Sequence, residues 1–119
     1  MEPSIAPHRV LEPTAVDRKI VLSRILAVAE AERLELSPTE EEVKATARWW
    51  RSEFGLLDLE SFARWLRYSG MDLPAFWQMM RDFTALTKVL QHHGAEVDAR
   101  MLDHLRIHTV RTFVGEGRT

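Results

Sequence analysis

Apolar residues recur along this chain at spacings of three and four, which is the period of an α-helix. No stretch of the sequence alternates with the period of two that indicates a half-buried strand. The pattern predicts an all-α fold of five helices. They run from about Thr14 to Leu34, from Ser37 to Glu53, between Asp58 and Gly70, from Asp72 to His93, and from about Glu96 to Phe113.

The first and the last of these helices differ in their apolar surface. In the first, apolar residues occupy most of the circumference: Val16, Ile20, Val21, Leu22, Ile25, Leu26, Val28 and Ala29. A helix facing one core needs a narrower stripe, so we expect this long helix to be enclosed on several sides, by its own chain or by a partner. The last helix has a weaker apolar face, and we expect it to be partly detached.

Small polar residues and glycines define the helix boundaries. Ser37 precedes Pro38 and Glu40, so Ser37 can accept the amide of the first turn while Pro38 supplies a preset φ. Other polar residues directly precede predicted helices, where a side chain can cap the first turn. Glycines follow the ends of helices, where a left-handed backbone conformation ends the helix. The predicted caps are Thr14, Ser37, Asp58 and Asp72, and the predicted stops are Gly55, Gly70 and Gly94.

The length of the chain, 119 residues, is that of one domain. Prolines at positions 3, 7 and 13 predict an extended N-terminal arm over residues 1–13. We expect a single helical domain over residues 14–113 and a disordered tail over residues 114–119.

The charge and cysteine content narrow the class of partner. The net charge of −2 gives no general attraction for phosphate backbones or anionic membranes, so we expect neither nucleic acid nor membrane as a partner. The chain contains no cysteine and starts without the apolar run of a signal peptide, which fits a cytoplasmic protein. No phosphate-cradling, dinucleotide-binding or nucleophile motif is present, and we expect no cofactor.

The aromatic residues are the main candidates for a binding surface. Trp49 and Trp77 lie outside the apolar stripes of their own helices, and a tryptophan in that position needs a neighbour. The predicted peptide-binding set also includes a methionine, which adapts to varied ligands, and two arginines that can pair with acidic groups. The full set is Trp49, Trp65, Tyr68, Trp77, Met80, Arg64 and Arg67. The alternatives are that these aromatics pack in the core or seal a homodimer, and that the arginines form a solvated face.

Four histidines near the C-terminus are weaker candidates for metal ligands. They are His92, His93, His104 and His108, of which the last two have the i, i+4 spacing that allows a shared ion. The flanking sequence lacks a metalloprotease motif, and histidines near a helix C-terminus are favoured by the helix dipole alone. We therefore predict no metal site, with the ligand role kept as an alternative.

Helix caps and core positions follow one another in a distinctive order in three stretches: AEAERLELSPTEEEV at 29–43, FGLLDLESFARWLRYSGMDLPAFWQMMRDF at 54–83, and TKVL at 87–90. This order resembles the N-terminal helical chaperone domain of the SurA-type and PpiC-type parvulin prolyl isomerases. The resemblance implies a five-helix domain of that kind, which holds extended, aromatic-rich polypeptide segments. The chain has no room for a parvulin domain after residue 95, so we expect a stand-alone module without isomerase activity.

Together these features predict a non-enzymatic module that binds an extended peptide or protein client, as a chaperone or as an accessory in a peptide-maturation pathway. One alternative is a small helical enzyme, or an enzyme subunit, that modifies peptides with an aromatic pocket and the four histidines. Another is a purely structural homodimer that exchanges its first helix between protomers.

Overall fold

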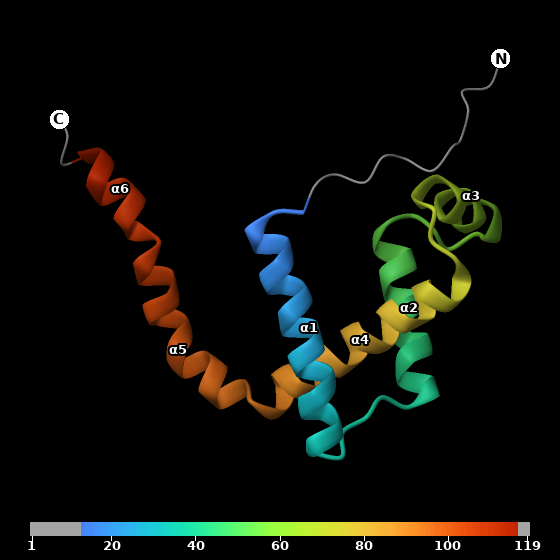
Figure 1. Cartoon of the computed structure of the whole chain (residues 1–119), viewed down its shortest axis with the longest axis horizontal. Helices are drawn as coiled ribbons and strands as arrows, with labels where there is room; N and C mark the ends of the chain where they lie inside the picture. Colours follow the sequence, from blue (N-terminus) through green and yellow to red (C-terminus); the bar gives the residue numbers. More distant parts are fainter. Residues whose placement is uncertain (1–12, 117–119) are drawn as a thin grey trace. The chain divides into compact units, whose positions relative to one another are not determined.

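The computed structural model describes residues 13–116, and every regular element within that range is helical (Figure 1). The predicted all-α class is confirmed. The helices are α1 (Ala15–Arg33), α2 (Glu40–Glu53), α3 (Leu59–Ser69), α4 (Leu73–His92), α5 (Gly94–Ile107) and α6 (Thr109–Glu116). The last predicted helix is interrupted at His108, so five predicted helical segments correspond to six elements.

The predicted terminal segments lie partly outside the described residues. Most of the predicted N-terminal arm, residues 1–12, lies outside the described residues, as do residues 117–119 of the predicted tail. Residues 114–116, which we assigned to that tail, form the last turn of α6 instead.

Side-chain caps set the N-termini of the first two helices. The Thr14 hydroxyl accepts the Asp17 N–H at 3.1 Å, and Asp17 accepts the Thr14 N–H at 2.9 Å. This reciprocal pair satisfies two amides of the first turn and confirms the predicted start of α1. In α2, however, the cap is Thr39 paired with Glu42, and the prediction of Ser37 as the cap is wrong. The signature S/T-x-x-E/Q fits Thr39 and Glu42 as well as Ser37 and Glu40, and the helix starts at the later pair.

The boundaries of α3 and α4 agree more closely with the sequence. Asp58 accepts the Ser61 N–H at 2.8 Å, and Asp72 accepts the Ala75 N–H at 2.8 Å. Gly70 ends α3 at a φ of 73° and Gly55 follows α2 at 67°, in the left-handed region that other residues adopt at a cost. Gly94 does not act as a stop, because the break falls at His93 and Gly94 begins α5.

The chain forms two compact units, one ending at Val89 and one beginning at Leu90. The prediction of a single helical domain over residues 14–113 stays a prediction beside this division. The physical basis of the division is burial, since α5 and α6 contain no buried residue while α1 to α4 contain all of those in the described chain. The first unit therefore holds the hydrophobic core.

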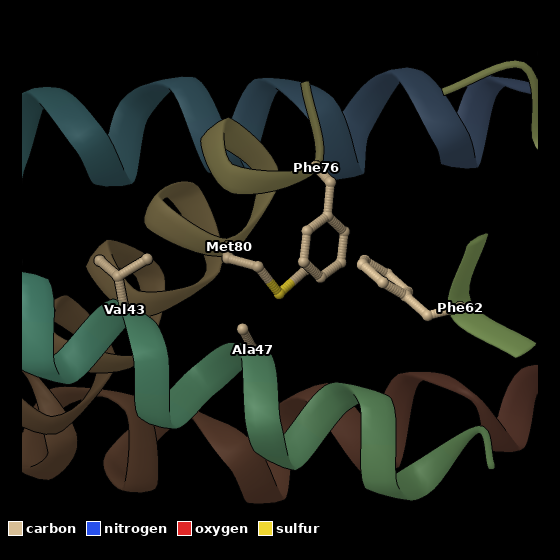
Figure 2. Close-up of a cluster of buried hydrophobic side chains, with 5 residues drawn as sticks. All are labelled: Val43, Ala47, Phe62, Phe76 and Met80. Carbon is tan, nitrogen blue, oxygen red and sulfur yellow. The ribbon is translucent and has the colours of Figure 1, made fainter. Parts of the chain in front are cut away.

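That core is formed where α2, α3 and α4 meet, and Figure 2 shows its five buried side chains converging. Val43 and Ala47 come from α2, Phe62 comes from α3, and Phe76 and Met80 come from α4. Phe76 and Met80 are each only 1% exposed. Two polar contacts also join α2 to α4: the Thr46 and Thr84 hydroxyls lie 2.7 Å apart, and Lys88 Nζ lies 2.8 Å from Glu42 Oε1.

Helix α1 contacts α4 through one arginine, and its buried residues are small. Ala27 and Ala31 are its buried residues, the Arg24 guanidinium lies 5.6 Å from the Phe83 ring centre, and Arg24 Nη1 donates to Met79 Sδ. The large apolar residues of α1 remain exposed. The expected enclosure on several sides is therefore not provided by the described part of the chain, which covers one side of α1.

Candidate functional site

An apolar groove lies between α2 and α4 in the first unit. We call it the α2–α4 groove, and its volume is about 770 Å³. Its walls consist of side chains one turn apart on each helix, which is why two helices are sufficient to form it. They are Ala45, Thr46, Trp49, Trp50, Phe54, Phe83, Leu86 and Thr87.

The polar side chains of this groove are committed to their own helices. The Thr46 hydroxyl donates to the Glu42 carbonyl at 3.1 Å, and the Thr87 hydroxyl donates to the Phe83 carbonyl at 3.0 Å. Both threonines therefore present methyl groups without a spare proton for a ligand. Such walls recognise a ligand by burying its apolar surface, with little directional selection.

Two aromatic side chains of the groove are already turned to solvent. Trp49 is 61% exposed and Phe54 is 63% exposed, whereas Trp50 between them is half-buried. The Trp50 ring lies 4.9 Å from the Phe54 ring and 5.6 Å from the Phe76 ring. Trp50 thus forms an inner wall that is held by core contacts. The exposed Trp49 and Phe54 rings form the rim and are free to cover an incoming side chain.

An ion pair joins the two helices beside the groove. Glu42 lies one turn before Thr46, and Lys88 follows Thr87. The hydrogen bond from Lys88, together with the Thr39 backbone amide, lowers the pKa of Glu42 to about 2. This carboxylate therefore stays charged at neutral pH and holds α2 against α4, without the raised pKa that a general acid requires.

Two smaller hollows lie nearby in the same unit. The α3 pocket, of about 390 Å³, is lined by Gly55, Leu56, Ser61, Arg64, Trp65 and Tyr68. The basic pocket, of about 410 Å³, is lined by Lys44, Ala47, Arg48, Arg51, Leu57 and Trp77.

Arg51 has a structural role in the basic pocket. It donates to the Leu56 carbonyl at 2.8 Å and to the Leu57 carbonyl at 2.7 Å, and its guanidinium lies 4.4 Å from the Phe62 ring centre. These contacts hold the loop between α2 and α3. Of the other two cations there, Lys44 lies 3.8 Å from Glu41 in an exposed ion pair, which leaves Arg48 for a ligand.

The predicted peptide-binding residues are distributed over these three hollows. Trp49 lines the α2–α4 groove, Trp77 lines the basic pocket, and three residues, Arg64, Trp65 and Tyr68, share the α3 pocket. Arg67 is exposed and lines none of the three. The prediction for Met80 is wrong, because this side chain is 1% exposed and fills the core, where no client can reach it.

Several groove residues did not emerge from the sequence as site candidates. Trp50 and Phe54 belong to the apolar stripe of α2, and Phe83 and Leu86 belong to that of α4, and a stripe of this kind indicates a core face rather than a binding site. The available signal was the adjacency of Trp49 and Trp50: two neighbouring indoles cannot both point into one core, because successive residues on a helix are about 100° apart.

The four histidines belong to the segment from the last turn of α4 through α5. The His92 and His93 rings lie 4.8 Å apart, and the His104 and His108 rings lie 5.0 Å apart. His93 is hydrogen-bonded to Glu96 at 2.9 Å, which lowers the pKa of that carboxyl. Over residues 13–116, no three His, Asp or Glu side chains gather in a way that could hold a metal ion.

Comparison of the chain with protein-family models, curated proteins and solved structures gives no match. A search of the described helices for length and apolar content also finds none that could cross a membrane.

Proposed function

We propose that this chain is a non-enzymatic peptide-binding module that holds an extended segment of a client polypeptide in the α2–α4 groove. The observation that supports this most directly is the groove itself, an apolar hollow of about 770 Å³ with two exposed aromatic rings at its rim. A volume of this size accommodates one or two bulky side chains.

The chemistry of the groove defines the preferred client. A leucine, phenylalanine or tryptophan side chain enters between Trp49 and Phe83, and the client backbone stays at the open side, where water satisfies its polar groups. Arg48 lines the basic pocket on the opposite side of α2 from Trp49, and we propose that it contacts an acidic residue farther along the client. We propose that Arg64 and Arg67 on α3 extend this preference along the client, with Trp65 and Tyr68 as a second aromatic contact.

The affinity of such a site is modest. A flexible client loses conformational entropy when it is ordered, and this loss offsets much of the free energy gained from apolar contacts. Modest affinity suits a module that holds a client and releases it. This role agrees with the resemblance to SurA-type chaperone domains, and we propose that it is exercised in the cytoplasm, as a chaperone or in a peptide-maturation pathway.

The test is a titration of the protein with a synthetic unfolded peptide that contains a tryptophan-free aromatic anchor flanked by acidic residues. Intrinsic tryptophan fluorescence should shift on binding, because Trp49 and Trp50 line the groove. Trp49→Ala should weaken binding about 30-fold, corresponding to about 2 kcal/mol for a buried aromatic contact.

The matched control is Leu59→Ala. Leu59 is 78% exposed and lies outside the three hollows, so its truncation removes apolar surface without altering the groove. Equal affinities for the Trp49→Ala and Leu59→Ala proteins, or a flat titration across peptides with phenylalanine, tyrosine and leucine anchors, would contradict the proposal.

A further inference from the structure

The outer side of α1 carries a second apolar surface, separate from the α2–α4 groove. Four large apolar side chains on this side are between 43% and 60% exposed: Val21, Leu22, Ile25 and Leu26. None of the residues that line the groove comes from α1. Contiguous exposed apolar surface of this kind marks an interaction site on a soluble protein.

The residues on this side follow the spacing of a helix-pairing seam. Arg18, Leu22, Ile25, Ala29 and Glu32 succeed one another at intervals of four, three, four and three residues, the pattern that keeps one face of a helix against another. We call these five residues the α1 seam. At 100° per residue the seam lies opposite Ala27 and Ala31, the buried residues of α1. All five seam residues are exposed.

The surface of the seam is also shaped to receive side chains. A hollow of about 340 Å³ lies along it and is lined by residues of α1 and the residue two positions before that helix: Pro13, Asp17, Arg18, Val21, Leu22 and Ile25. A hollow between the side chains of successive turns is the feature that accepts a side chain from a facing helix.

The charges at the two ends of the seam are opposite and unpaired. Arg18 lies at the N-terminal end and Glu32 at the C-terminal end, with Ile25 midway between them. Among the described residues, neither side chain makes an ion pair or a hydrogen bond. The seam therefore presents an apolar centre with one free cation and one free anion at equal distances from it.

We propose that α1 pairs with α1 of a second copy of this chain in an antiparallel homodimer, with the two-fold axis at Ile25. Residue i then faces residue 50 − i, so Arg18 lies opposite Glu32 of the second copy and Glu32 lies opposite its Arg18. The next pair follows the same rule, because Asp17 lies opposite Arg33.

This charge arrangement selects the antiparallel orientation. A parallel pair would place Arg18 against Arg18 and Glu32 against Glu32, and like charges in contact are unfavourable. A single pair of helices buries less surface than the roughly 1,200 Å² of a standard stable interface, so the dimer dissociates on dilution. No α1 residue lines the α2–α4 groove, and the pairing does not depend on the proposed peptide binding.

Disulfide trapping tests the orientation and the register, and the absence of cysteine from the sequence makes each introduced thiol unique. Ile25→Cys is expected to form a covalent dimer under mild oxidation, because the two copies of residue 25 meet at the axis. Arg18→Cys should not link to itself, since the two copies of residue 18 are about 21 Å apart along the axis. A mixture of Arg18→Cys and Glu32→Cys proteins should link to each other.

Two results of the trapping experiment would overturn the proposal. One is the absence of a covalent dimer for Ile25→Cys. The other is linkage of Arg18→Cys to itself as readily as that of Ile25→Cys, which indicates parallel or random contact. Circular dichroism of each variant checks the fold, which should be retained because all three positions are exposed.

Sedimentation of the full chain over a range of concentrations tests the energetics. Arg18→Glu and Glu32→Arg should each weaken the dimer about tenfold, because each reversal places like charges together at two symmetric positions. The double variant, with both reversals in one chain, should recover the affinity of the native protein. Ile25→Asp should be monomeric, with Leu59→Asp on α3 as the matched control that remains dimeric. A native chain that sediments as a monomer throughout, or a double variant no better than the single ones, overturns the proposal.

Discussion

Phe76 is the residue on which the first unit depends most, and its truncation to alanine is the sharpest test of the packing described above. The side chain is 1% exposed, and its ring lies within 6.3 Å of four other aromatic rings. Three of these are Trp50, Trp65 and Trp77, which line the α2–α4 groove, the α3 pocket and the basic pocket respectively. Phe76 thus supports the walls of all three hollows at once.

The magnitude follows from the burial and from the ring contacts. A buried Phe→Ala change costs about 3–5 kcal/mol, and each well-oriented aromatic pair adds about 0.5–1.5 kcal/mol beyond the area it buries. Because Phe76 has four ring neighbours, we expect the cost of Phe76→Ala to lie at the upper end of this range, at about 4–5 kcal/mol. Phe76→Leu keeps most of the volume and should cost about 1–2 kcal/mol.

The assay is urea unfolding of the full chain, followed by far-UV circular dichroism and by tryptophan fluorescence. If Phe76→Ala leaves too little folded protein to measure, Phe76→Leu supplies the comparison. The control is Phe54→Ala: Phe54 is 63% exposed and, among the described residues, its ring contacts that of Trp50, so its truncation should cost less than about 1 kcal/mol. If Phe76→Ala lowers the free energy of unfolding by less than about 1 kcal/mol, which is the bound set for Phe54→Ala, the central role of this ring is refuted.

Three further predictions concern the helix ends and the ion pair beside the groove. Thr39→Ala should destabilise the first unit by about 1 kcal/mol in thermal unfolding, and Ser37→Ala by much less, because Thr39 is the residue that caps α2; equal effects would contradict this assignment. Gly55→Ala should cost about 1 kcal/mol in urea unfolding, since a φ of 67° is unfavourable for alanine, and no loss would show that the turn can relax. The pKa of Glu42 is lowered from 4.5 in the unfolded chain to about 2, so its contribution to stability is present above pH 4.5 and is lost as the pH falls toward 2. The native protein should therefore lose stability more steeply than Lys88→Met over that range in acid unfolding, and identical slopes would contradict this role of the ion pair.

Local chemistry explains which parts of the site could be predicted. Trp49 stands outside the apolar stripe of α2, so its exposure follows from helical periodicity alone. Arg64, Trp65 and Tyr68 lie within five residues of one helix, and their meeting in one pocket needs no information beyond that helix. Met80 shows what periodicity cannot predict. The apolar stripe of α4 contains both core and groove residues, and only the packing of α2 against α4 places Met80 in the core.

The sequence by itself determined the all-α class, most helix boundaries and the exposure of Trp49, because these depend on periodicity, caps and glycines within one or two turns. Only the tertiary structure decided that Thr39 rather than Ser37 starts α2, that the core ends with α4, and that the groove lies between Trp49 and Phe83. The physical reason is the separation along the sequence of the residues that make each feature. A cap or a stripe is set by neighbours a few residues away, whereas a groove requires side chains more than thirty residues apart to be placed together by the burial of Phe76 and Met80 between them.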